Sequence, residues 1–161
     1  MRSFLNQIEG KWISQRTTYY MKNNKIDNNK AEFIIRRLKN IDSLIQTDNQ
    51  YSTQGMKKYD AYSITWNSIP KQNIVYNIFS TDSDLHAGSI RKVDNQIYTK
   101  YNFYLENSNS LQLNYVENNI QSTEKIHFVN PNLRISTSII KKFGKCIAIS
   151  FASEIKIDNM S

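Results

Sequence analysis

Apolar and polar residues alternate with a period of two along most of this chain, the pattern of β-strands that bury one face. The alternating runs are rich in Tyr, Ile, Thr, Val and Phe, residue types that favour strands. The pattern predicts ten strands, at about Trp12–Met21, Glu32–Lys39, Lys57–Trp66, Asn73–Ser80, Leu85–Lys92, Gln96–Leu105, Ser110–Val116, Gln121–Phe128, Leu133–Lys141 and Cys146–Ile157.

Residues that favour turns separate these runs. The predicted turns are Asn28-Asn29, Asp94-Asn95, Asn107-Ser108-Asn109, Asn118-Asn119 and Phe143-Gly144. Regularly spaced short strands with tight turns are typical of an up-and-down barrel or a sandwich. A meander of about ten strands can close on itself and remove its exposed edges. We therefore predict an all-β fold, an antiparallel up-and-down β-barrel forming one domain over residues 1–161.

Two short helices are predicted beside the strands. The first spans Ser3 to Ile8, with Ser3 as its N-cap and Gly10 as its stop signal. The second spans Ile41 to Gln46, where apolar residues follow helical spacing. A helix this short is not stable alone, so each must pack against the strands.

The last predicted strand has one bulky face and one small face. Ile147, Ile149, Phe151 and Ile155 share the first, whereas Ala148, Ser150, Ala152 and Glu154 share the second. Two interpretations stay open at this point. The bulky face is the core and the small face meets solvent, or the small face borders a cavity into which Glu154 points.

Composition and charge narrow the class of protein. The chain carries a net charge of +7, with 22% charged and 39% hydrophobic residues, as in a soluble globular domain. Its basic residues are scattered, which favours an acidic protein partner over nucleic acid. The single cysteine, Cys146, cannot form an internal disulfide, and a reducing compartment is expected. We predict no metal site, because His86 and His127 lie far apart and lack neighbouring ligands.

Three blocks resemble the signatures of the S-type phycobiliprotein lyases, the CpcS/CpeS chromophore lyase family. They are Gly10 to Tyr19 (GKWISQRTTY), Glu124 to Ser138 (EKIHFVNPNLRISTS) and Ser150 to Lys156 (SFASEIK), in the family's order and spacing. The middle of the chain matches weakly, through Trp66, Gly88 and Arg91. The chain departs from the usual residues at Tyr19 or Tyr20, Ile135 and Ala152, which leaves the ligand class intact but the choice of bilin open.

The resemblance implies a barrel like that of lipocalins and fatty-acid-binding proteins. It also implies transfer of an open-chain tetrapyrrole, typically phycoerythrobilin or phycocyanobilin, to a cysteine of a phycobiliprotein subunit, typically β. The bilin is then a substrate and no cofactor is permanently bound. Trp12, after Gly10, is expected to plug the barrel floor, and Cys146 to be an ordinary wall residue.

The chemistry of a bilin suggests roles for the residues in these blocks. Guanidinium groups suit its two propionates, so Arg16 and Arg134 are candidate ligands. Carboxylates suit its pyrrole N–H groups, so Glu124 and Glu154 are the candidate catalytic residues. Hydroxyl groups and an aromatic face complete the candidate bilin-binding set, with Ser136, Ser138 and Trp66.

Alternative functions share the predicted fold. One is a non-enzymatic carrier of a bilin or fatty acid, and another is an assembly factor that binds antenna proteins without pigment. The first residues lack a signal or transit peptide, which predicts a cyanobacterial cytoplasm or a plastid stroma with plastid encoding. A homodimer is also compatible with the sequence.

Overall fold

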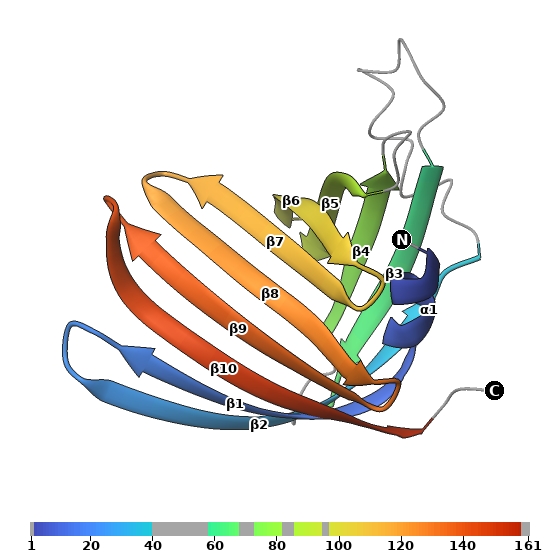
Figure 1. Cartoon of the computed structure of the whole chain (residues 1–161), viewed down its shortest axis with the longest axis horizontal. Helices are drawn as coiled ribbons and strands as arrows, with labels where there is room; N and C mark the ends of the chain where they lie inside the picture. Colours follow the sequence, from blue (N-terminus) through green and yellow to red (C-terminus); the bar gives the residue numbers. More distant parts are fainter. Residues whose placement is uncertain (1, 40–57, 68–72, 82–85, 95–96, 159–161) are drawn as a thin grey trace, which may run out of the picture.

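Ten antiparallel strands form a closed barrel in the computed structural model of this chain (Figure 1). The structure describes residues 2–39, 58–67, 73–81, 86–94 and 97–158. The strands are β1 (Gly10–Tyr20), β2 (Lys25–Arg37), β3 (Lys58–Trp66), β4 (Asn73–Thr81), β5 (Ala87–Asp94), β6 (Ile97–Asn107), β7 (Ser110–Glu117), β8 (Ile120–Asn130), β9 (Leu133–Lys142) and β10 (Lys145–Asp158). Each strand pairs with its neighbours in sequence, and β1 closes the barrel against β10. The predicted up-and-down barrel is confirmed.

A short helix covers one end of the barrel. Helix α1 (Arg2–Ile8) lies there in Figure 1 and buries Phe4, Leu5 and Ile8 against the barrel core. It begins one residue before the predicted cap at Ser3. No helix among the described residues is long and apolar enough to cross a bilayer. The predicted helix over Ile41–Gln46 lies outside the described residues.

The end beneath α1 is packed solid and forms the barrel floor. Its buried cluster includes Trp12, Phe33, Tyr62, Phe103 and Phe128, all at most 3% exposed. Trp12 is fully buried, and its indole N–H donates to the Ile8 carbonyl at 2.9 Å, so the helix and the first strand are tied together. Gly10, two residues earlier, has a φ of 138°, which favours glycine at the start of β1. The expected floor role of Trp12 is confirmed.

Two of the predicted turns are tight hairpins at the opposite end, the barrel mouth. Asn118 and Asn119 have φ angles of 48° and 63°, and Phe143 and Gly144 have 50° and 76°. Positive φ at both central residues matches the twist of two-residue hairpins, and Asn and Gly adopt it readily. These turns place the β7–β8 and β9–β10 hairpins at the mouth.

The prediction of a turn at Asn28-Asn29 is wrong. Both residues lie inside β2, paired with Thr17 and Arg16 of β1, and the chain reverses earlier, before Lys25. Thr17 Oγ1 donates to Asn28 Oδ1 at 2.8 Å. On this exposed stretch of sheet, a cross-strand hydrogen bond lets asparagine occupy a strand position that its turn propensity disfavours.

Strand β10 resolves the two interpretations of its alternating faces. Its small face points inward, since Ala148, Ala152 and Glu154 are 3%, 1% and 6% exposed. Its bulky face points outward, with Phe151 49% and Ile155 53% exposed. The small residues therefore border the barrel interior, as the cavity interpretation predicts.

Candidate functional site

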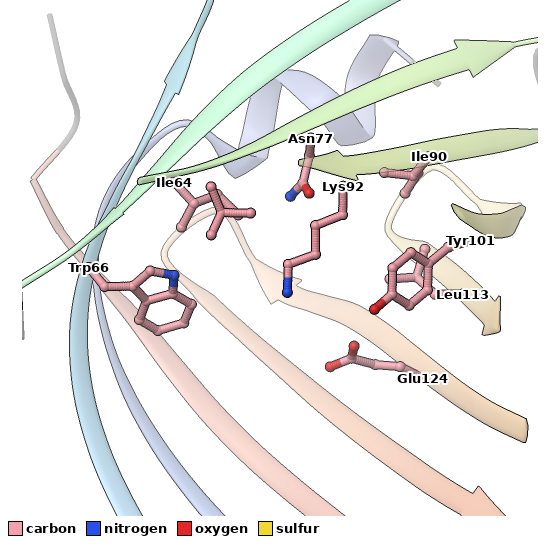
Figure 2. Close-up of a pocket in the computed structure, with 9 residues that line it drawn as sticks. Ile64, Trp66, Asn77, Ile90, Lys92, Tyr101, Leu113 and Glu124 are labelled. Atoms are coloured by element: carbon pink, nitrogen blue, oxygen red, sulfur yellow. The ribbon is translucent and has the colours of Figure 1, made fainter. Parts of the chain in front are cut away.

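The barrel interior holds a cavity of about 180 Å³ between the packed floor and the mouth. Figure 2 shows side chains from strands β3 to β8 around it. Its lining consists of Ile64, Trp66, Val75, Asn77, Ile90, Lys92, Tyr101, Leu113 and Glu124. A mostly apolar wall with a few convergent polar groups is the usual composition of a small-molecule site.

Three polar groups face each other across this cavity. Lys92 of β5, Tyr101 of β6 and Glu124 of β8 point toward its centre in Figure 2. Burial of the ring, together with the nearby Glu124 carboxylate, raises the pKa of the Tyr101 phenol above its usual value of 10.0. Tyr101 therefore stays a protonated hydrogen-bond donor over the physiological pH range.

An ion pair crosses the inner wall beside the cavity. Arg16 Nη2 of β1 lies 3.3 Å from Glu124 Oε1 of β8, although β10 and β9 separate these strands. The side chains between them are small, because Ala152 and Ser136 follow Arg16 in register across the sheet. The small face of β10 thus leaves room for a long guanidinium side chain to lie along the wall.

Hydroxyl groups line the same stretch of wall. Ser138 pairs in register with Glu124 on one side and Ser150 on the other, and the two serine Oγ atoms lie 2.6 Å apart. Ser136, nearer the floor, is 4% exposed. This wall therefore presents hydroxyls beside a carboxylate and a guanidinium.

A second ion pair lies deeper, in the barrel floor. Arg134 Nε donates to Glu154 Oε2 from the adjacent register position, and the two side chains are only 9% and 8% exposed. The Arg134 guanidinium also lies over the Trp12 ring, 4.5 Å from its centroid. Such a buried, paired and stacked cation closes the floor with few unsatisfied polar atoms.

A lysine adds another cation at this level. Lys156 Nζ donates to the Gln7 carbonyl at 2.8 Å and lies 5.0 Å from the centroid of the Trp12 ring. Burial and the neighbouring Arg134 charge lower the pKa of Lys156 below its usual value. Lys156 therefore ties β10 to the helix that covers the floor.

Trp66 stands at the mouth end of β3, above the floor cluster. Its ring lies 4.7 Å from that of Phe33, centroid to centroid, and Trp66 also lines the cavity. Figure 2 shows the indole directed toward Lys92. An aromatic face at this position can stack on a flat, conjugated ligand.

All of the predicted site residues face the interior, but the structure divides them into two groups. Glu124 and Trp66 line the cavity, and Arg16, Ser136 and Ser138 share the wall beside it. Arg134 and Glu154 form the floor pair, outside the residues that line the cavity. The roles assigned to these residues toward a ligand remain predictions.

Sequence reasoning missed Lys92, Tyr101 and Asn77. The alternation around Lys92 is ambiguous, because both faces of β5 carry a charged residue, Arg91 on one and Lys92 on the other. Only the register, in which Lys92 pairs with Asn77 and Thr99, places it inside. No group of three or more potential metal ligands occurs among the described residues.

Comparison with known proteins identifies the family. The family model described as CpeS-like protein matches residues 1–157, nearly the whole chain. The chain belongs to the CpeS-like family. It is thus a member of the CpcS/CpeS chromophore lyase family of phycobiliproteins, as the sequence blocks indicated.

Named relatives of this CpeS-like chain span almost its full length. A chromophore lyase CpcS/CpeS homolog from Gracilaria tenuistipitata var. liui is 34% identical, covering 98% of each chain. A homolog from Porphyra purpurea is 33% identical, covering 96% of this chain and 97% of its own. The chromophore lyase CpcS/CpeS of Thermosynechococcus vestitus is 25% identical, covering 98% and 92%.

A solved structure supports the fold. The S-type phycobiliprotein lyase CPES from Guillardia theta superposes with a TM-score of 0.71 at 15% identity, covering 99% of this chain and 93% of that one. At this identity the match supports the barrel architecture, which the strand order of the CpeS-like chain also gives.

Proposed function

We propose that this CpeS-like chain binds an open-chain tetrapyrrole non-covalently and transfers it to a cysteine of a phycobiliprotein subunit through a thioether bond. Phycoerythrobilin is the bilin we expect, and a β subunit the acceptor. The proposal rests on the cavity of this chain, which belongs to the CpeS-like family. Lys92 and Glu124 line that cavity, and Arg16 pairs with Glu124 beside it.

Opposite charges in the cavity suit the two kinds of polar group on a bilin. Arg16 and Lys92 approach Glu124 from different sides, the first from β1 and the second from β5. In this proposal the two cations hold the propionates and the Glu124 carboxylate accepts hydrogen bonds from the pyrrole N–H groups. Trp66 stacks on the conjugated rings, and Ser136 and Ser138 add hydroxyl contacts.

The size of the cavity suggests how much of the ligand it encloses. At about 180 Å³ it is smaller than the roughly 300–1,000 Å³ of pockets that enclose a drug-sized molecule. We therefore expect the polar middle of the tetrapyrrole inside and one end of it in the mouth. A cysteine thiol of the acceptor could reach the end in the mouth but not the enclosed part.

The transfer step is an addition and needs no oxidant or reductant. The acceptor thiol adds across the ethylidene double bond of the bilin: a C–S and a C–H bond form while the S–H bond and the π bond break. The Glu124 carboxylate serves as the general acid–base group: it accepts the proton of the thiol as the C–S bond forms and passes that proton to the bilin, where it completes the C–H bond. Holding the bilin in one extended shape beside the thiol lowers the entropic part of the barrier.

The floor pair has a less direct place in this proposal. Arg134 and Glu154 lie beneath the cavity and satisfy one another, so they fix the floor on which the ligand rests. Contact of Arg134 with a propionate, and of Glu154 with the bilin nitrogens, remain predictions. If Glu154 activates the bilin, Glu154→Gln should lower the rate of bilin transfer more than the affinity for the bilin. Equal losses in rate and affinity would mean that Glu154 only binds the bilin.

The net charge of the chain fits the expected partner. A net charge of +7 favours encounter with an acidic protein, as we expect of the acceptor subunit. We place the protein where phycobiliproteins are assembled, in a cyanobacterial cytoplasm or a plastid stroma.

A titration with phycoerythrobilin tests the binding step. The purified chain should shift the absorbance of the bilin, and Lys92→Met should weaken binding about tenfold or more, the usual size of a lost charge-assisted contact. Lys100→Met is the matched control, because Lys100 is exposed on the adjacent strand. No shift with the unmodified chain, or equal effects of the two substitutions, would contradict the proposed site.

A further inference from the structure

Three hairpins border the barrel mouth, at the end opposite helix α1 (Figure 1). They join β1 to β2, β7 to β8 and β9 to β10. The Phe143 N–H donates to the Asn119 carbonyl at 2.9 Å, and the Met21 N–H donates to the Ile147 carbonyl at 3.0 Å. These backbone hydrogen bonds tie the three hairpins into one edge. We call this edge the mouth rim, formed by residues 20–25, 117–120 and 141–145.

More than half of the net positive charge of the chain lies on the mouth rim. Its charged residues are five lysines and one glutamate, all exposed: Lys22, Lys25, Lys141, Lys142, Lys145 and Glu117. Their net charge is +4, compared with +7 for the whole chain. By contrast, the two hairpins beside α1 at the floor, residues 106–110 and 130–132, carry no lysine or arginine. The charge that attracts an acidic partner is therefore concentrated where the cavity opens.

The lysines of the mouth rim do not stabilise the fold. Lys25 Nζ lies 3.0 Å from Asp27 Oδ1 in an exposed pair, and the other four lysines form no ion pair among the described residues. Lys142 and Lys145 lie directly opposite each other in the register of β9 and β10. Like charges in this position destabilise a sheet. The charges of the rim are thus available to a partner whose carboxylates would remove this repulsion.

The tip of the β9–β10 hairpin carries an aromatic side chain that the barrel does not bury. Phe143 is 71% exposed and has a φ of 50°. A positive φ is unfavourable for a bulky residue, whereas asparagine adopts it readily. The neighbouring β7–β8 hairpin has Asn118 at its first central position, with a φ of 48°. Exposure and backbone strain both act against the folded chain at Phe143, and strained residues of this kind cluster at functional positions.

We propose that the mouth rim is the docking surface for the acceptor subunit, and that it binds an acidic face around the acceptor cysteine. This inference rests on the proposed function, because a protein that takes the bilin from the cavity has to approach the mouth. The lysines pair with carboxylates of that face, and Phe143 fills an apolar pocket within it, as aromatic residues do at the centre of interfaces. An acidic protein is favoured over an anionic bilayer, since a bilayer lying on the rim would block the thiol from the mouth.

Direct binding of an apo-phycobiliprotein β subunit tests the docking surface without any transfer step. Interferometry on the immobilised, unmodified chain should detect binding that weakens as salt is added. Lys141→Glu combined with Lys145→Glu should weaken it at least about tenfold. The matched control is Lys30→Glu combined with Lys100→Glu, which makes the same change of charge at exposed positions in mid-strand. This control should keep the affinity within about twofold.

Phe143→Asn separates docking from folding. Asparagine adopts the positive φ readily, so the urea midpoint should stay the same or rise. The affinity for the acceptor should fall at least about tenfold, because the aromatic anchor is lost. Tyr104→Asn is the control, since Tyr104 is a 52% exposed aromatic residue on β6, between the floor residues Phe103 and Leu105. It should leave the affinity for the acceptor unchanged.

The outcomes separate this proposal from the proposed function. Phycoerythrobilin binding should be equal in the rim variants and the unmodified chain, because the cavity lining described above includes no rim residue. Absence of bilin binding or transfer in the unmodified chain, with rim-dependent binding of the acceptor, would contradict the proposed function alone. The docking surface would be overturned if the acceptor does not bind, or if rim and control variants bind it equally. Rim-dependent binding to phosphatidylglycerol vesicles without acceptor binding would also overturn it.

Discussion

Arg16 and Glu124 meet inside the barrel with 3.3 Å between Nη2 and Oε1, although β9 and β10 lie between the strands that carry them. The contact depends on the small side chains of the intervening strands, Ala152 and Ser136 among them. Both members of the pair are partly exposed, at 42% and 27%, so a ligand entering from the mouth can reach them. We therefore expect this ion pair to contribute more to ligand binding than to the stability of the barrel.

Arg16→Gln is therefore expected to affect binding and to leave stability nearly unchanged. Partly exposed ion pairs contribute little to the free energy of unfolding, at most about 1 kcal/mol. A lost guanidinium–propionate contact costs about tenfold or more in bilin affinity. Urea unfolding and a bilin titration of the same preparation measure the two effects. A large loss of stability with unchanged affinity would assign Arg16 to the fold instead.

Glu154→Gln should have the opposite profile in an unfolding experiment. It leaves the Arg134 charge buried without its counter-ion, and breaking a buried pair in this way costs about 3–5 kcal/mol. The exposed pair of Lys11 and Glu32 supplies the control, since Glu32→Gln should change the urea midpoint little. Similar midpoints for the two variants would mean that the floor pair does not support the barrel.

Alkaline pH should destabilise the chain through Tyr62. Burial raises the pKa of Tyr62 to about 12, whereas the unfolded phenol titrates near 10.0. Between these values the folded state holds a proton that the unfolded state releases, so the free energy of unfolding falls as pH rises, by about 3 kcal/mol in all. Tyr62→Phe removes this contribution. Chemical denaturation from pH 8 to 11.5 should show a shallower decline for the variant, and parallel curves would refute the assignment.

Cys146 is expected to take no part in transfer. It is exposed at the start of β10, and the proposed nucleophile belongs to the acceptor. Cys146→Ser should therefore keep the transfer rate within about twofold, because serine preserves the size of the side chain. Loss of transfer in this variant, with bilin binding intact, would indicate a covalent intermediate on this chain.

The fold could be predicted from the sequence because strand alternation and turn residues repeat along the whole chain. The pairs Asn118-Asn119 and Phe143-Gly144 occupy hairpin positions that require positive φ, and local chemistry is sufficient to locate them. Asn28 and Asn29 show the limit of this reasoning. Their place in β2 depends on cross-strand partners on β1, which no local signal gives.

The candidate site could be predicted only in part. The candidate site residues in the family blocks face inward, yet the sequence could not separate the floor pair from the cavity residues. That separation depends on the register of β9 against β10 and on the stacking of Arg134 over Trp12. Lys92 was missed because both faces of β5 carry a charged residue, so alternation alone does not show which face points inward. The pairing of β5 with β4 in the closed barrel places Lys92 inside.

Covalent transfer is the most direct measurement of the central claim. The purified chain is loaded with phycoerythrobilin, mixed with an apo-phycobiliprotein β subunit, and the acceptor is assayed for covalent fluorescence on a denaturing gel. We predict a fluorescent acceptor band with the unmodified chain. With Glu124→Gln the band should be at least about tenfold weaker, because general acid–base catalysis typically contributes about a hundredfold or more to a rate. An acceptor that stays colourless, or is labelled equally without this chain, would contradict the account.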